Sequence, residues 1–283
     1  MEVIRTVADT LAACAAAHAA GHSVGLVPTM GAFHDGHVSL MRRARAECDL
    51  AVVSIFVNPT QFSDPADLAA YPREEERDLA TAEGLGFDVA FVPSIEQMYP
   101  TGAPVVTVDP GALGDRLEGA SRPGHLRGVA TVVAKLLNAV GPSRAYFGEK
   151  DAQQLAVMRW MVRDLAFPVE VVSCPTVREP DGLAMSSRNR RLTREGREAA
   201  GCLFLALSEA AELARAGEPD AAVLVAVMAR EIGATPEARL DYAVVVDEET
   251  FQEVRTLERS ARALVAARFG DVRLIDNLRL PTP

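Results

Sequence analysis

Two histidines with a glycine between them, His34 and His37 around Gly36, are the residues of this 283-residue chain best suited to phosphate chemistry. They close the segment Pro-Thr-Met-Gly-Ala-Phe-His-Asp-Gly-His, residues 28–37. A helix is expected to begin near His37, so its free N–H groups and positive dipole end face the same space. Two imidazoles there can donate hydrogen bonds that strengthen as charge builds on phosphorus. Gly36 is expected to allow a tight turn and close ligand approach.

Three further polar segments, residues 58–61, 148–151 and 178–189, come after other strand-like runs. In the second, Lys150 is a suitable point charge for a phosphate oxygen, and Asp151 could accept ribose hydroxyls. The third offers hydroxyl and guanidinium donors, which suit a triphosphate. The amides of Gln61 and Gln154 could orient a carboxylate and hydroxyl groups. The motif GxxxxGK[ST] of P-loop proteins is absent.

Strand-like and helical stretches alternate through the first 180 or so residues and must position these groups. Strands are expected at residues 24–28, 51–57, 89–92, 144–147 and 169–172, and helices at residues 11–20, 38–47, 74–83, 129–140 and 152–165. This βαβα order predicts a doubly wound, Rossmann-like α/β domain with a parallel sheet. Because ligands bind outside the carboxyl ends of such strands, the polar segments are expected to meet at one edge.

The pattern changes after Val177. Residues 178–191 are polar and loop-like, and Thr193 is expected to cap one long helix that reaches about Ala214. Another helix is expected at residues 219–232, followed by strands around residues 242–246, 263–267 and 272–275. This order predicts a smaller α+β C-terminal lid domain, with domains 1–177 and 178–283.

The composition favours a soluble cytoplasmic protein. Apolar residues make up 49% of the chain, and the net charge of −10 argues against a general nucleic-acid binder. No apolar run is long enough to cross a membrane, and residues 11–20 fit a first helix better than a signal peptide. The four cysteines are far apart, which favours buried reduced thiols over a zinc site or a disulfide framework.

Seven segments together resemble the pantothenate synthetase (pantoate–β-alanine ligase) family of the HxGH nucleotidyltransferase superfamily. They are residues 28–37, 56–62, 71–73, 117–119, 122–125, 146–155, and 175–179 taken with 185–189. The resemblance implies ATP-dependent joining of (R)-pantoate to β-alanine through a pantoyl adenylate, with release of pyrophosphate and AMP. No covalent intermediate with the protein is implied, which agrees with the lack of a nucleophile–His–acid pattern.

The resemblance also implies residue roles. The ATP site would comprise Met30, Gly31, Ala32, Phe33, His34, Asp35, Gly36, His37, Gly148, Glu149, Lys150, Asp151, Val177, Met185, Ser186, Ser187 and Arg188. His34, His37 and Lys150 would be catalytic, Gln61 and Gln154 would hold pantoate, and Gln61 would also contact β-alanine. Residues that would shape these pockets are Asn58, Tyr71, Arg122 and His125. A homodimer is implied, and Mg²⁺ would neutralise the triphosphate, with Asp78 as a candidate ligand.

Two other functions remain open on the residues alone. An HxGH enzyme that transfers AMP to a phosphate acceptor would use the same histidines. This alternative assigns no function to Gln61 and Gln154. A non-catalytic nucleotide-binding protein would not need Lys150. The departures from the family pattern, at Phe33, Asp35, Leu126 and Ala152, lie beside the reacting groups or concern packing, so they affect the expected rate more than the reaction type.

Overall fold

The computed structural model describes residues 1–281 and contains two compact units. The first comprises Met1–Glu149 and Gln153–Cys174, and the second comprises Lys150–Ala152 and the chain from Pro175 onward. The main change of unit therefore falls three residues before the predicted boundary at Val177. The short insertion Lys150–Ala152 belongs to the second unit, which no sequence pattern indicated.

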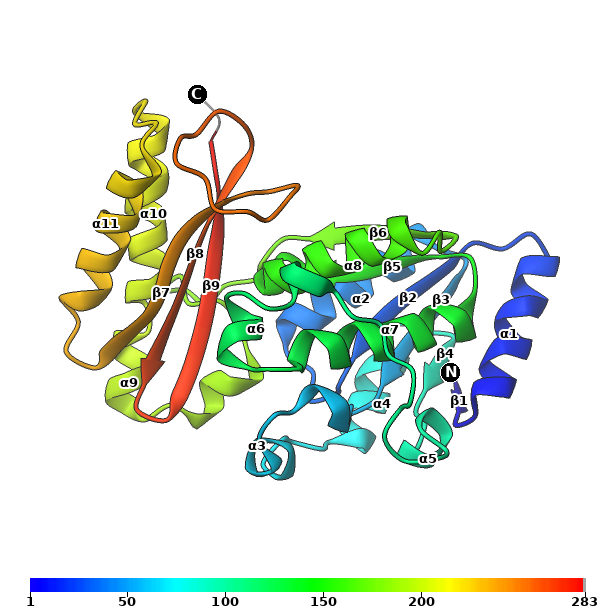
Figure 1. Ribbon diagram of the computed structural model, residues 1–283. Helices are drawn as coiled ribbons and strands as arrows, with labels where there is room; N and C mark the ends of the chain where they lie inside the picture. Colours follow the sequence, from blue (N-terminus) through cyan, green and yellow to red (C-terminus); the bar gives the residue numbers. More distant parts are fainter. Residues whose placement is uncertain (282–283) are drawn as a thin grey trace. The chain divides into compact units, whose positions relative to one another are not determined.

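The first unit contains the predicted parallel sheet, now with six strands (Figure 1). In spatial order they are β1 (Glu2–Ile4), β4 (Val89–Phe91), β3 (Leu50–Ile55), β2 (Val24–Thr29), β5 (Ser143–Gly148) and β6 (Val169–Cys174). Every neighbouring pair is parallel, for example Val27 with Val53. The doubly wound architecture is confirmed. The three-residue edge strand β1 was not predicted, because it is too short to show a pattern.

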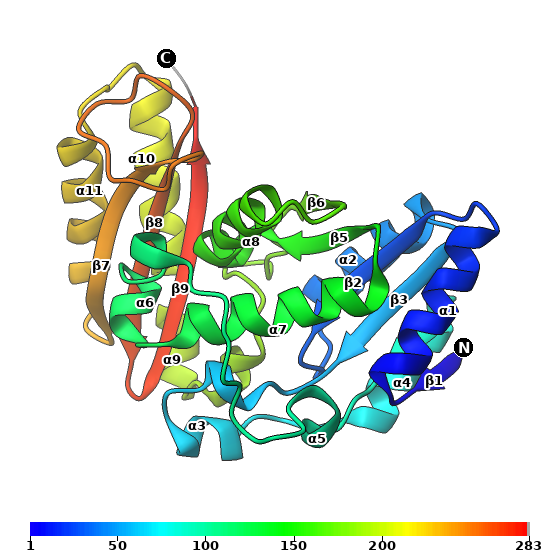
Figure 2. The same ribbon diagram turned by 45° about the vertical axis from the view of Figure 1, so that its right-hand side comes forward.

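Helices cover both faces of this sheet (Figure 2). The longer ones are α1 (Val7–Ala19), α2 (Asp35–Glu47), α4 (Glu75–Gly84), α7 (His125–Val140) and α8 (Ala152–Asp164). Short helices occupy the connections: η1 (Pro59–Gln61), α3 (Pro65–Ala69), α5 (Ile95–Met98), η2 (Gly111–Leu113), α6 (Glu118–Ser121) and η3 (Glu149–Asp151).

The central strands β2 and β3 are mostly apolar, and both of their faces are buried. Leu26 and Val52 point into a core that they share with α1, α7 and α8. Their neighbours Val27 and Val53 point into the opposite core, which includes Met41 of α2. This two-sided burial explains why the strands read as continuous apolar runs rather than as alternating ones.

The strand order reverses between β2 and β5. From β2 the chain adds β3 and then β4 on one side, and it later returns to place β5 and β6 on the other side. Such a switch point leaves a crevice at the carboxyl ends of the two central strands, where α/β proteins bind ligands. The His34–His37 segment follows β2, and Gly148 and Glu149 end β5 and begin the turn after it.

The second unit is an antiparallel three-stranded sheet with helices packed on it (Figure 1). Its elements are η4 (Ser187–Arg191), α9 (Arg194–Ala199), α10 (Cys202–Arg215), α11 (Ala221–Gly233), β7 (Ala238–Asp247), β8 (Ala261–Phe269) and β9 (Val272–Leu280). The central strand β8 is buried almost throughout and shares a core with α10 and α11. The predicted α+β class of this region is confirmed.

Two predictions about this unit were wrong in detail. The single helix expected from Thr193 to Ala214 is two helices, α9 and α10, which meet at Ala200 and Gly201. Glycine has a low helix propensity and stands at the break. The stretch expected to be an irregular loop contains the 3₁₀ helix η4 and an antiparallel bridge between Arg178 and Ala184.

All four cysteines are free and buried. In the part of the chain that the structure describes, no helix is both long enough and apolar enough to cross a membrane.

Candidate active site

The loop after β2 has an unusual backbone. Gly31 and Ala32 both have left-handed conformations, with φ of 81° and 52°. A left-handed backbone suits Gly31, which has no Cβ atom, but the same conformation is strained for Ala32. The carboxylate of Asp78 compensates by accepting hydrogen bonds from the N–H groups of Ala32, at 2.7 Å, and Phe33, at 2.9 Å. The loop is thus held in one shape before any ligand arrives.

Asp78 is therefore a structural residue of this loop. It is 1% exposed, and burial raises the pKa of its carboxyl while the two backbone bonds oppose that rise. A Cβ on Gly31 would lie 2.7 Å from its Oδ2 atom. Both carboxylate oxygens accept backbone hydrogen bonds, so the structure gives Asp78 a role in holding the loop, and its role as a Mg²⁺ ligand stays a prediction. Among residues 1–281, no group of three or more His, Cys, Asp or Glu side chains could hold a metal ion.

His34 and His37 cap the first turn of α2 reciprocally. His34 is the N-cap residue, and its Nδ1 atom accepts the N–H of Gly36 at 3.1 Å. The N–H of His34 in turn faces Nδ1 of His37 at 3.4 Å. The two rings lie 4.1 Å apart between centroids, tilted by 40°. This is the geometry of a capping box in which both side chains are imidazoles.

The cap determines what the two rings can offer to a ligand. A neutral imidazole that accepts through Nδ1 carries its proton on Nε2, so each ring presents an Nε2–H donor. These donors lie at the positive end of a 13-residue helix. The arrangement suits a phosphate group whose negative charge increases during a reaction.

The tight turn expected at Gly36 lies elsewhere, while its contact with ATP stays a prediction. Gly36 lies inside α2, which begins at Asp35 rather than near His37, and the tight turn occurs earlier, at Gly31 and Ala32. A Cβ at position 36 would lie 2.7 Å from Cε1 of His34. Glycine is therefore needed there to make room for the imidazole of the cap.

Gln61 lies in a second cluster of the first unit, in the turn η1 after β3. Its side chain is 7% exposed. Its Oε1 atom accepts from Nδ2 of Asn58 at 3.1 Å, and its Nε2 atom donates to Sδ of Met30 at 2.9 Å. The sulfur contact is a weak one that a ligand oxygen could replace. This contact joins the Gln61 turn to the loop after β2.

Asn58 and His125 fix the backbone of that turn. Asn58 is buried and also donates to the carbonyl oxygen of Gly128, while its Oδ1 atom accepts from the hydroxyls of Tyr99 and Thr60. The ring of His125 bonds the carbonyl oxygen of Gln61 through Nδ1 at 2.8 Å. These bonds hold the Gln61 turn, and the expectation that Asn58 and His125 shape a substrate pocket stays a prediction.

The two glutamines at the start of α8 have different environments. Gln153 is buried and bonds the N–H of Glu118 and the carbonyl oxygens of Leu113 and Arg116. Its amide is therefore committed to holding α6 and the loop before it. Gln154 is only partly buried, so its amide remains suitable for the predicted contact with an acid.

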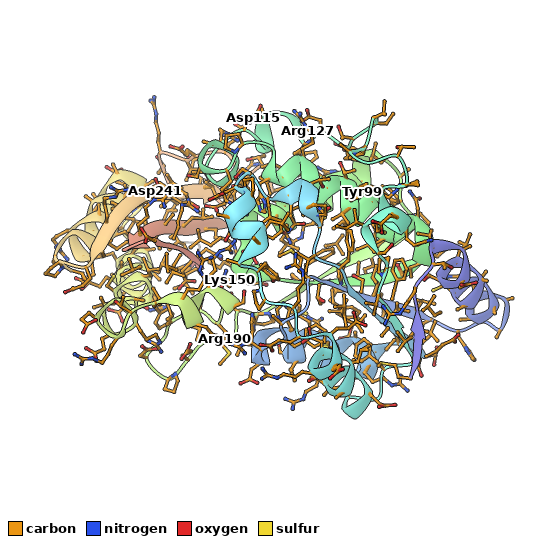
Figure 3. All side chains as sticks on the ribbon, turned by 90° about the horizontal axis from the view of Figure 1, so that it is seen from below. Tyr99, Asp115, Arg127, Lys150, Arg190 and Asp241 are labelled. Atoms are coloured by element: carbon orange, nitrogen blue, oxygen red, sulfur yellow. The ribbon has the colours of Figure 1, made fainter. Side chains whose placement is uncertain are left out.

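Lys150 and Asp151 lie in the 3₁₀ turn η3 and belong to the second unit. Lys150 is labelled in Figure 3. Its side chain is 18% exposed, and its Nζ atom lies 3.4 Å from Oδ1 of Asp151, which is a long contact for an ion pair. The ammonium group is thus partly shielded from solvent, and it also interacts electrostatically with the buried carboxylate of Asp276.

The remaining predicted nucleotide contacts, Val177 and residues 185–188, also lie in the second unit. The N–H of Met185 donates to the carbonyl oxygen of Val177 at 2.9 Å, so the structure brings these two together. Ser186 caps the turn η4 by accepting from the N–H of Arg188. Asn189 anchors this turn through bonds from Nδ2 to Glu179 and to the carbonyl oxygen of Ala184.

Comparison with known proteins identifies the family. The model of the pantoate-beta-alanine ligase family matches residues 2–279. The chain belongs to the pantoate-beta-alanine ligase family. It is 50% identical to the pantothenate synthetase of Moorella thermoacetica and 51% identical to that of Chloroflexus aggregans. The alignment with the Moorella protein covers 99% of both chains. The alignment with the Chloroflexus protein covers 98% of this chain and 99% of that one. The resemblance found in the seven motifs is confirmed, and the chain is a ligase.

Solved structures of this family agree with the fold. The pantothenate synthetase of Thermus thermophilus superposes with a TM-score of 0.92 at 48% identity, covering 99% of this chain and 100% of that one. A ligase from Francisella tularensis, crystallised with a β,γ form of ATP and β-alanine, superposes with a TM-score of 0.79 at 34% identity. That alignment covers 99% of this chain and 97% of the Francisella chain.

One residue of this ligase site gave no chemical signal in the sequence. Gly128 lies within the apolar helix α7, where a Cβ atom would come within 2.3 Å of the carbonyl oxygen of Thr60 and 2.8 Å of Cα of Gln61. Only a glycine lets the helix approach the η1 backbone this closely. A glycine inside a buried helix is the signal that could have indicated it.

We expect Gly128→Ala to damage the Gln61 turn. The added methyl group meets backbone atoms, which cannot rotate away, so the turn must move and the free energy of unfolding should fall by about 1–3 kcal/mol. Steady-state kinetics should show a raised KM for the substrate acid that Gln61 is predicted to hold. Gly84→Ala is the matched control, because a Cβ there meets nothing within 4 Å. Equal behaviour of the two variants would contradict the packing role.

Proposed function

We propose that the protein joins pantoate to β-alanine in two steps that consume ATP. Pantoate and ATP first give pantoyl adenylate and pyrophosphate, and the amine of β-alanine then displaces AMP to form pantothenate. Membership of the family supports the overall ligation. The observation that carries the adenylation step is the imidazole cap of His34 and His37 at the carboxyl end of β2, beside the switch point of the sheet.

In the first step, a carboxylate oxygen of pantoate attacks the α-phosphorus of ATP, and the bond to the bridging oxygen of pyrophosphate breaks. Charge builds on the phosphate oxygens during this displacement. The Nε2–H groups of His34 and His37 and the N-terminus of α2 are proposed to stabilise that charge, and the capping contacts support this because they fix both rings in advance. Lys150 is proposed to add a positive charge at the same stage.

In the second step, the amine of β-alanine attacks the acyl carbon, and AMP leaves with the bridging oxygen. The amine must lose a proton overall, and no protein nucleophile takes part. Gln61 is proposed to orient pantoate in both steps and to contact β-alanine, with Gln154 as a further pantoate contact. A buried amide with fixed partners suits this task, because it binds hydroxyl and carboxylate groups without adding a charge that would bind the wrong acid.

Among the described residues, no group of three or more His, Cys, Asp or Glu side chains could hold a metal ion, and both oxygens of Asp78 accept backbone N–H groups. A Mg²⁺ ion that accompanies ATP is therefore proposed to enter as part of the nucleotide substrate, coordinated mainly by phosphate oxygens and water. A cytoplasmic location and a homodimer remain predictions from composition and from the family.

A pyrophosphate-release assay tests the proposal. Enzyme in excess over ATP should release pyrophosphate when pantoate is present, even without β-alanine, because the adenylate forms first. Pantoate labelled with ¹⁸O in its carboxylate should transfer one labelled oxygen to AMP when β-alanine is added. Release of ADP and inorganic phosphate instead would contradict the adenylate while leaving ligation possible. Pyrophosphate release that depends on a phosphorylated acceptor, and not on pantoate, would favour the alternative nucleotidyltransferase.

A further inference from the structure

We propose that Asn277 of β9 is a positioning residue for Lys150. This inference rests on the proposed function, in which Lys150 acts on the phosphates of ATP. Nδ2 of Asn277 donates a 2.8 Å hydrogen bond to the carbonyl oxygen of Lys150. The bond links β9 to the η3 turn, 127 residues earlier in the chain, and both partners lie in the second unit.

The side chain of Lys150 does little to fix the turn that carries it. Its contact with Asp151 is long and joins neighbouring residues of the same turn, so it cannot anchor that turn to the rest of the protein. Asn277, by contrast, is 3% exposed and lies on a strand paired along its length with β8. A hydrogen bond from a rigid strand fixes the backbone of Lys150 and so limits where its ammonium group can reach.

The orientation of the Asn277 amide is also determined. Its Oδ1 atom accepts from NH1 of Arg262 at 2.6 Å, and NH2 of Arg262 is held by Glu248 at 2.6 Å. A guanidinium group can only donate, so the amide oxygen must face Arg262 and the NH₂ group must face Lys150. If the amide flipped, its NH₂ group would face the donors of Arg262 and its oxygen would face the carbonyl oxygen of Lys150.

The main chain of Asn277 is anchored as well. Its N–H donates to Oδ1 of Asp276 at 2.7 Å, and its carbonyl oxygen accepts from Arg178 at 3.2 Å. Arg178 and Asp276 form a two-bond ion pair, with the Asp276 side chain 1% exposed. Arg178 directly follows Val177, a predicted nucleotide contact, so one buried network supports both segments of the proposed ATP site in this unit.

Asn277→Asp removes the donor while keeping the size of the side chain and an acceptor for Arg262. The carboxylate would face the carbonyl oxygen of Lys150, so the turn should shift. We expect single-turnover adenylation to slow by about fivefold, the effect of one lost hydrogen bond, with KM for pantoate and β-alanine nearly unchanged. Asn277→Ser shortens the side chain without adding charge and should slow adenylation to a similar extent. It replaces Asn277→Asp in the experiment if that variant does not fold.

A double-mutant cycle with Lys150→Ala separates positioning from general damage. If Asn277 acts through Lys150, adding Asn277→Asp to Lys150→Ala should slow adenylation no further. Arg273→Gln is the matched control, because Arg273 lies on the same strand and loses a 2.7 Å bond to Asp241, labelled in Figure 3. It should leave the adenylation rate unchanged.

The outcomes distinguish the two proposals. If Lys150→Ala alone adenylates at the normal rate, the role of Lys150 in the proposed function is wrong. If Lys150→Ala is slow but the folded Asn277 variants are normal, or if the two losses are additive, the positioning role alone is overturned.

Discussion

His37→Gln should slow adenylation by about a hundredfold while leaving α2 intact. Removal of a preorganised donor to a developing charge, or of a proton donor, has an effect of this order. Glutamine at the third helical position can still accept the N–H of His34, as in an ordinary capping box, so the cap should survive. Single-turnover pyrophosphate release measures the step directly, and circular dichroism with thermal unfolding checks the fold.

Two further histidine variants make this result specific. His34→Asn also retains an N-cap acceptor and should lose adenylation to a similar extent. His22→Gln is the control, because His22 is exposed and precedes strand β2, whereas the imidazole cap follows the other end of that strand. A normal adenylation rate in His37→Gln would mean that the imidazole cap is only structural.

Lys150→Ala should keep the fold and slow adenylation by about tenfold or more, which corresponds to at least about 1.4 kcal/mol of lost transition-state stabilisation. The chain contains 27 arginines and only two lysines, so a lysine at this position is not explained by a general preference for it. A compact ammonium group differs from a planar guanidinium in reach and geometry. Lys150→Arg should therefore restore the rate only in part.

The other lysine provides the control for this experiment. Lys135 lies on α7 with its ammonium 5.6 Å from the ring centroid of Tyr99. Lys135→Ala removes the same charge and side chain, and it should leave single-turnover adenylation unchanged. Loss of adenylation in both variants to the same extent would show that net charge, and not the place of Lys150, controls the rate.

The amino-acid sequence alone predicted the parallel sheet, the α+β region and the segments that carry the chemistry. Continuous apolar runs such as residues 51–57 report two-sided burial, which is a local property of a strand. The HxGH segment by itself indicates a phosphate site but not the acid that accepts the nucleotide. The choice of pantoate came from the resemblance of seven motifs, and the family comparison supports it.

Only the tertiary structure decided how those segments are held. Asp78 supports Ala32 from 46 residues away, and Asn277 holds Lys150 from 127 residues away. Gly128 has no side chain to signal a role, and its importance comes from the backbone of Thr60 and Gln61 packed against it. Sequence patterns report hydrogen bonds and burial within one element, because those repeat with its period. Contacts between distant elements have no such period, so the sequence indicated neither the loop-holding bonds of Asp78 nor the contacts of Gly128 and Asn277.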